Sequence, residues 1–142
     1  MSRLCDASRD IKEGIRDIEE GLRDIREGLN DIRHCKTCEG IKDIREGLND
    51  IKEGLEDIKE GLKDIGFDID PCHQSCEGER DIREGIKDIE EGIRDIEEGL
   101  RDIENCRINE GIRDIEEGIR DIEEGLKDIK EGLRDLFCFD NR

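Results

Sequence analysis

One seven-residue phrase, Asp-Ile-x-Glu-Gly-(Ile/Leu)-x, recurs through almost the whole chain, and no other feature constrains the fold as strongly. With the residue after each Gly taken as position a, Ile or Leu occupies a and Ile occupies d, as at Leu22 and Ile25. Apolar residues spaced alternately three and four apart line one face of an α-helix, whereas a strand requires a period of two. The repeat therefore predicts amphipathic helices that pack as in coiled coils.

The phase of this heptad repeat breaks at three places, which divide the chain into four segments. Two breaks of equal length lie at 32–41 and 103–112, and the third, at 66–78, contains the only proline, Pro71. The second half of the sequence matches the first at an offset of 71 residues, so that Cys35 corresponds to Cys106. The pattern predicts helices over about 9–34, 39–66, 79–105 and 110–137.

Short connections between consecutive helices favour antiparallel neighbours. The predicted fold is all-α, with two tandem antiparallel hairpins over residues 1–71 and 72–142, related by the internal duplication. Together they are expected to form one up-down-up-down, coiled-coil-like four-helix bundle.

Glycine occupies position g in nearly every heptad, although Gly inside a helix costs about 1 kcal/mol relative to Ala. Because Gly has no side chain, it lets two backbones approach closely, and a tight seam within each hairpin is predicted. The expected register sets Gly14 opposite Gly61 and Gly21 opposite Gly54. The alternative is that Gly reflects repeat expansion alone. The predicted seam glycines are Gly14, Gly21, Gly28, Gly47, Gly54, Gly61, Gly85, Gly92, Gly99, Gly118, Gly125 and Gly132.

The outer positions of the heptad are charged: b is usually Arg or Lys, c is Asp and f is Glu. This face accounts for most of the net charge of −18, and it is interpreted as a solvated surface rather than a site for cations or basic partners. Such acidity argues against a nucleic-acid partner. No apolar run approaches the length of a membrane span.

Position e carries charges of both signs, and their order predicts a second kind of seam, between helices of different hairpins. Pairing at e inside a hairpin would set Arg26 against Arg45, whereas antiparallel pairing across hairpins brings opposite charges together. Whether such seams lie within one chain or between chains is left open. The predicted pairs are Arg45–Glu104, Lys52–Glu97, Lys59–Glu90, Glu19–Lys130, Arg26–Glu123 and Arg33–Glu116.

Seven cysteines lie in the helix connections or near the chain ends. One interpretation is a set of disulfides, with one thiol left for a neighbouring molecule. The alternatives are unpaired thiols and zinc, the latter bound by His34 with the three cysteines at its end of the bundle, and by four cysteines at the other. The two expected groups are Cys35, Cys38 and Cys106 with His34, and Cys5, Cys72, Cys76 and Cys138 with His73.

Catalytic signatures are missing from the sequence, which has no Ser/His/Asp set, phosphate-binding loop or dinucleotide fingerprint. We therefore expect a non-enzymatic structural subunit without a cofactor, which self-assembles into a filament, appendage or coat and is cross-linked through cysteines. A cell or spore surface in an oxidising environment is the expected location. The alternatives are a small zinc-binding or redox-responsive bundle, and an acidic helical module that binds a basic protein.

The predicted charge pairs can be tested by reversing one of them. Lys52→Glu should weaken the pairing with Glu97, and adding Glu97→Lys should restore it, because each exposed pair contributes roughly 0.2–1 kcal/mol. A double-mutant cycle on the free energy of unfolding measures this coupling. Zero coupling energy would contradict the proposed arrangement of the e positions.

Overall fold

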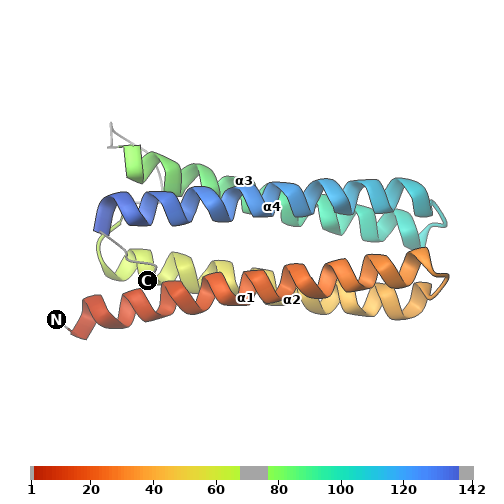
Figure 1. Ribbon diagram of the computed structural model, residues 1–142, viewed down its shortest axis with the longest axis horizontal. Coiled ribbons are helices and arrows are strands. Elements are labelled where there is room, and N and C mark those ends of the chain that lie inside the picture. Colours follow the sequence, from red (N-terminus) through yellow and green to blue (C-terminus); the bar gives the residue numbers. More distant parts are fainter. Residues whose placement is uncertain (1, 68–76, 138–142) are drawn as a thin grey trace. The chain divides into compact units, whose positions relative to one another are not determined.

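The computed structural model describes residues 2–67 and 77–137, with side chains over 5–67 and 77–135, and this part of the chain is almost entirely α-helical. The fold class is all-α, as the heptad repeat predicts. The four helices are α1 (Ser2–Arg33), α2 (Thr37–Asp64), α3 (Glu77–Glu104) and α4 (Ile108–Phe137), shown in Figure 1.

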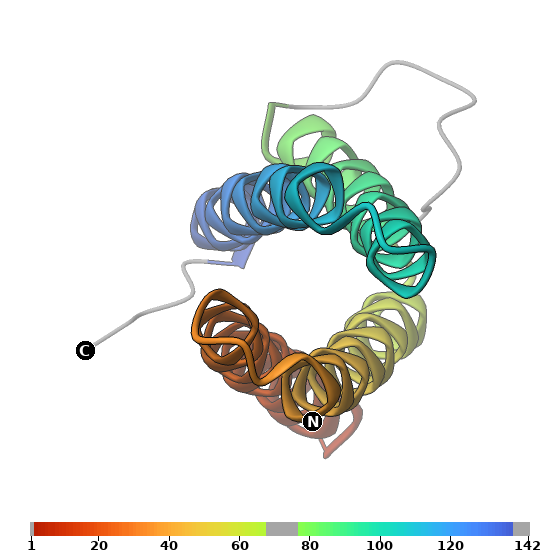
Figure 2. The same cartoon turned by 90° about the vertical axis from the view of Figure 1, so that its right-hand side faces the viewer.

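Each helix packs against its neighbour in sequence: α1 against α2, and α3 against α4. Both pairs are antiparallel hairpins closed by three-residue connections, 34–36 and 105–107 (Figures 1 and 2). The chain divides into two compact units, Met1–Phe67 and Asp68–Arg142. The predicted boundary between residues 71 and 72 lies outside the described residues. The assembly of the two hairpins into one bundle stays a prediction.

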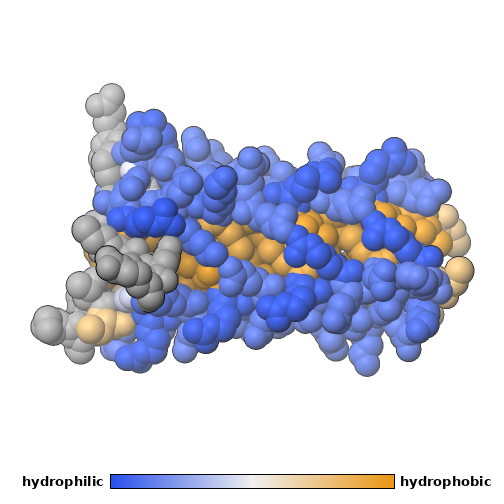
Figure 3. Space-filling view, viewed as in Figure 1, coloured by the Kyte–Doolittle hydropathy of each residue, from blue (hydrophilic) through white to orange (hydrophobic). Residues whose placement is uncertain are grey.

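Burial follows the heptad position closely. Most Ile residues at d, such as Ile18 and Ile51, are fully buried, and Leu residues at a, such as Leu22 and Leu48, are at most 6% exposed. Positions b and f are exposed throughout, so the outer faces of the helices are hydrophilic (Figure 3). No buried polar or charged side chain occurs among the described residues. None of the described helices is long and apolar enough to cross a membrane.

The glycines at position g lie where the two backbones of a hairpin meet. A Cβ built on Gly28 would lie 2.6 Å from the carbonyl oxygen of Gly40, and one built on Gly40 would lie 2.5 Å from that of Gly28. The d-position Ile of the facing helix closes the remaining space, since the Cγ1 of Ile44 would be 2.6 Å from a Cβ on Gly28. These positions have no room for a side chain, which explains glycine at g better than repeat expansion does.

The predicted register of the seam is wrong by one heptad. Gly14 faces Gly54 rather than Gly61, and Gly21 faces Gly47 rather than Gly54, while Gly61 lies against Ala7 and Ile11. The reason is the tight connection: α2 begins at Thr37, two residues before the predicted start, so the turn is centred near residue 35. Helices α3 and α4 repeat this arrangement, with Gly85 facing Gly125.

Replacing a seam glycine should reverse the usual effect of Gly→Ala in a helix. In an open helix Gly21→Ala would stabilise by about 1 kcal/mol. Here the new Cβ would clash with the Gly47 carbonyl oxygen, so we expect a loss of about 1–3 kcal/mol, and a larger loss for Gly21→Leu. Denaturant unfolding measures the change. Glu20→Ala, at the exposed preceding residue, is the control, and a stabilised Gly21→Ala variant would disprove the tight seam.

Candidate functional site

Both hairpin tips are built from the same helix-ending motif, with a cysteine at its centre. At the first tip, the Lys36 amide donates to the Asp31 carbonyl (2.8 Å) and the Cys35 amide donates to the Ile32 carbonyl (3.1 Å). These two bonds define a Schellman motif, in which the residue after the helix adopts a left-handed conformation. Cys35 is that residue, with φ of 66°.

The second tip repeats the motif residue for residue. The Arg107 amide donates to the Asp102 carbonyl (2.8 Å), the Cys106 amide donates to the Ile103 carbonyl (3.0 Å), and Cys106 has φ of 68°. Among the described residues, Cys35 and Cys106 are the only non-glycine residues with positive φ. A side chain in this region clashes with its own backbone, at a cost of roughly 1–2 kcal/mol.

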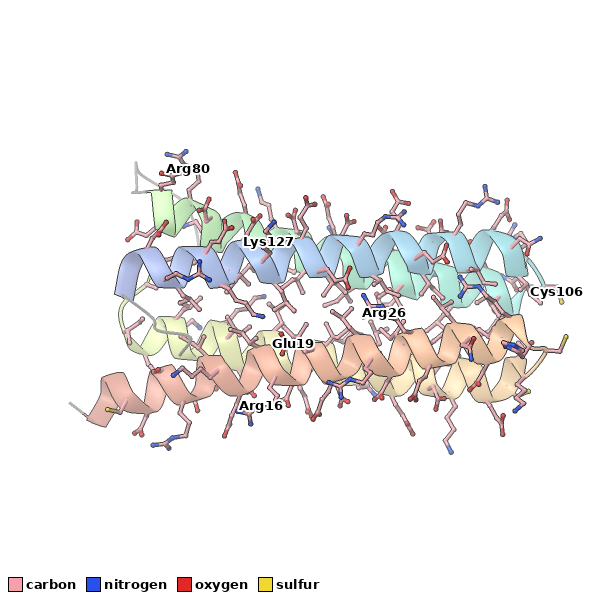
Figure 4. All side chains as sticks on the ribbon, in the orientation of Figure 1. Arg16, Glu19, Arg26, Arg80, Cys106 and Lys127 are labelled. Carbon is pink, nitrogen blue, oxygen red and sulfur yellow. The ribbon has the colours of Figure 1, made fainter. Side chains whose placement is uncertain are left out.

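The C-terminal end of α2 shows the residue that this motif normally prefers. There the Phe67 amide donates to the Leu62 carbonyl and the Gly66 amide to the Lys63 carbonyl, each at 2.9 Å, and Gly66 takes the left-handed position with φ of 82°. The same chain thus uses glycine at one such end and cysteine at both hairpin tips. Each cysteine presents an exposed thiol at a strained position (Figure 4 for Cys106).

The surroundings of the two tips differ in detail. At the first, Cys38 is an exposed second thiol at the start of α2, and the ring Nδ1 of His34 lies 2.8 Å from the Asn30 carbonyl oxygen. At the second, Asn109 replaces Cys38 and Ile108 is a 38% exposed apolar side chain.

An exposed arginine also braces the second tip. This residue is Arg107, whose guanidinium group pairs with Asp102 Oδ1 (3.4 Å) and with Glu110 Oε1 (3.7 Å). Together with Arg113 and Asp114, these charged side chains line a shallow surface depression beside the tip. The thiol of Cys106 is not among the lining residues of that depression.

No disulfide is formed among the described cysteines. Cys5, Cys35, Cys38 and Cys106 are all free and exposed. No group of three or more His, Cys, Asp or Glu within the described ranges is placed to bind a metal ion. The remaining predicted residues, Cys72, His73, Cys76 and Cys138, lie outside the described residues.

The twelve predicted charge-pair residues all lie on the helices at position e. In α1, Glu19 and Arg26 lie on the side of the helix opposite Arg16, which occupies the exposed position b (Figure 4). Their pairing across hairpins stays a prediction.

The sequence interpretation of position c as part of a solvated face is wrong. Every c-position Asp between the hairpin ends is half-buried, whereas Asp64 and Asp135, beyond those ends, are exposed. We call this half-buried set the aspartate ladder. Its members are Asp10, Asp17, Asp24, Asp31, Asp43, Asp50 and Asp57 in the first hairpin, and Asp81, Asp88, Asp95, Asp102, Asp114, Asp121 and Asp128 in the second.

The close approach of the helices at the glycine seam brings aspartates of the ladder near the facing helix. A Cβ built on Gly54 would lie 3.1 Å from the Cβ of Asp17, and one built on Gly118 would lie 3.3 Å from the Cβ of Asp95. Asp17 and Asp95 therefore each pack over a glycine of the facing helix. The sequence contains a signal for this, since from Asp10 onward position c is Asp in every heptad of the four helices, whereas b and e vary.

Partial burial and facing carboxylates raise the pKa values of seven members of the ladder. Burial raises the pKa of Asp95 to about 6, and Asp121, Glu117 and Asp114 of the facing helix add to the effect. The pKa values of six further members are raised for the same two reasons. These are Asp43, Asp50, Asp57, Asp88, Asp114 and Asp128.

Comparison of the chain with protein-family models, with curated proteins and with solved structures gives no match.

The strain at the tips predicts a stabilising substitution. Cys35→Gly and Cys106→Gly should each raise the free energy of unfolding by about 1 kcal/mol in reductant, because glycine adopts the left-handed conformation without a clash. The two effects should add, since the tips belong to separate hairpins. Gly66→Cys, the matched reverse substitution, should lower stability by a similar amount. Unchanged or lower stability of the two cysteine variants would contradict the assigned strain.

Proposed function

We propose that this chain is a non-enzymatic structural subunit that self-assembles and is cross-linked between copies through its cysteines into a filament, appendage or coat. The observation that carries the proposal is the pair of exposed thiols at the two hairpin tips, held in the left-handed position that glycine would occupy without strain. A chain that uses glycine for this motif at residue 66 keeps cysteine at both tips, which favours a role for the thiols outside the hairpin.

The shape of the hairpins supports cross-linking at their ends. A helix of 28 residues, such as α2, is about 42 Å long. Thiols at the tips of such rods can reach a neighbouring copy without disturbing the seam. Seven cysteines are an odd number, so at least one remains for a bond to another chain. Cys38 is the strongest candidate, because the matching position in the second hairpin is Asn109.

The zinc-binding alternative is less well supported. The described residues hold no group of ligands placed for a metal, and the thiols at the tips are exposed rather than gathered around a common point. The second alternative, an acidic module that binds a basic partner, is also weaker, because the exposed charge repeats along every helix and offers no distinct patch.

The assembly proposal can be tested by electrophoresis of the full chain after oxidation with oxidised glutathione, which accepts the two electrons that each new disulfide releases. We expect a ladder of covalent oligomers that collapses in reductant to the chain mass of 16.4 kDa. Electron microscopy of the oxidised sample should show polymers, with an axial repeat on the order of 40 Å if copies stack end to end.

Cys38→Ser should shorten the ladder while leaving the helical circular dichroism signal intact, because Cys38 is exposed. Asn109→Ser, at the matching position of the second hairpin, removes no thiol and should leave the ladder unchanged. A wild-type chain that stays monomeric after oxidation, with no polymers in the microscope, would overturn the proposal. Bound zinc in native mass spectrometry of that monomer would favour the metal-binding alternative.

A further inference from the structure

The aspartate ladder sets like charges along the whole length of each hairpin. In the second hairpin, members of α3 and α4 alternate across the seam: Asp95 faces Asp121, and Asp102 faces Asp114. Burial and the facing Asp121 raise the pKa of Asp95, and burial and the facing Asp102 raise that of Asp114, because a nearby carboxylate disfavours a second negative charge. Burial and the facing Asp31 raise the pKa of Asp43 in the first hairpin.

We propose that the two helices of each hairpin form a proton-responsive seam, in which facing aspartates share protons below neutral pH and hold the helices together more firmly than at higher pH. The inference goes beyond the structural role proposed above and does not depend on it. Protons bind to the facing aspartates. The part of the structure that responds is the contact between α1 and α2, and that between α3 and α4.

The glycines make the response unavoidable. Because the g positions have no side chain, the backbones come together until the Cβ of Asp95 would lie 3.3 Å from a Cβ on Gly118. The aspartates beside the seam are then half-buried. Two carboxylates held this close cannot both be charged without mutual repulsion, whereas one protonated carboxyl can bond to the other.

The charges that face Asp95 offer no compensation. On the facing helix α4 they are Asp121, Glu117 and Asp114, which are all acidic. The basic residues at position b of α4 and of α3 are all exposed. They are Arg113, Arg120 and Lys127 on α4, and Lys87, Arg94 and Arg101 on α3.

The direction of the pH effect follows from proton linkage. A carboxyl with a pKa of about 6 in the folded chain, as at Asp95, binds more protons than its unfolded counterpart between about pH 4 and 6. Folding is therefore favoured at the acidic side of this window. Stability is lost as the pH rises through 6 and Asp95 becomes charged.

The direct test is an NMR titration of the side-chain carboxyl carbons in the full-length chain. Asp95 should titrate near pH 6, and Asp121→Asn should move its midpoint toward the ordinary range of Asp, because the facing charge is gone. Asp135→Asn changes the same residue type at the same heptad position in the same helix, but at an exposed site beyond the ladder. It should leave the Asp95 midpoint where it is.

A second test measures the stability of the chain against denaturant at two pH values. The denaturant midpoint of the wild type should be higher at about pH 5.5 than at pH 8. Replacing Asp95 and Asp121 together by Asn should raise the midpoint at pH 8 and reduce the gain on acidification, while Asp135→Asn should do neither. An Asp95 that titrates near 4 in the wild type would overturn the proposal without any variant. Equal behaviour of the ladder variant and the Asp135→Asn control would overturn it as well.

Discussion

The close approach of two glycine-lined backbones is the contact on which the rest of each hairpin depends. A Cβ at Gly28 or Gly40 would lie within 2.6 Å of the carbonyl oxygen of the other residue, so side chains are excluded from the seam. The helix propensity lost at these glycines is offset by the fully buried d-position Ile of the facing helix, such as Ile44. Close packing of glycine against isoleucine along its whole length stabilises such a hairpin, rather than any single polar contact.

This contact decides the chemistry at its rim. In an ordinary coiled coil, residues flanking the core point into solvent, and a charge there affects stability little. Here position g has no side chain, so the c-position aspartates of the two helices lie near one another. Asp95 therefore lies close to the negative charges of Asp121 and Glu117. The same feature that makes the hairpin tight thus makes it sensitive to protons, because tightness and carboxylate crowding have one cause.

The choice of residue at the hairpin tips differs from that along the seam. Along the seam, glycine occupies every position where a side chain would not fit, yet at the two hairpin turns the position best suited to glycine is Cys35 or Cys106. Gly66, in the same motif at the end of α2, shows that the chain can use glycine there. The strain is local and repeated in both halves, and the exposed thiols it carries are the basis for the proposed cross-linking.

The sequence alone determined the helices, their order and the identity of the buried residues, because a heptad repeat assigns each residue to a face before any tertiary contact exists. It also indicated why glycine recurs at g. It could not determine the register, since a shift by one heptad leaves every face unchanged, and only the tight turn centred near Cys35 selected Gly14 against Gly54 over Gly61. Nor could it place the aspartate ladder at the rim of the seam, because the half-buried state of Asp95 arises from the distance between two backbones, which is a property of the packed hairpin and not of either helix.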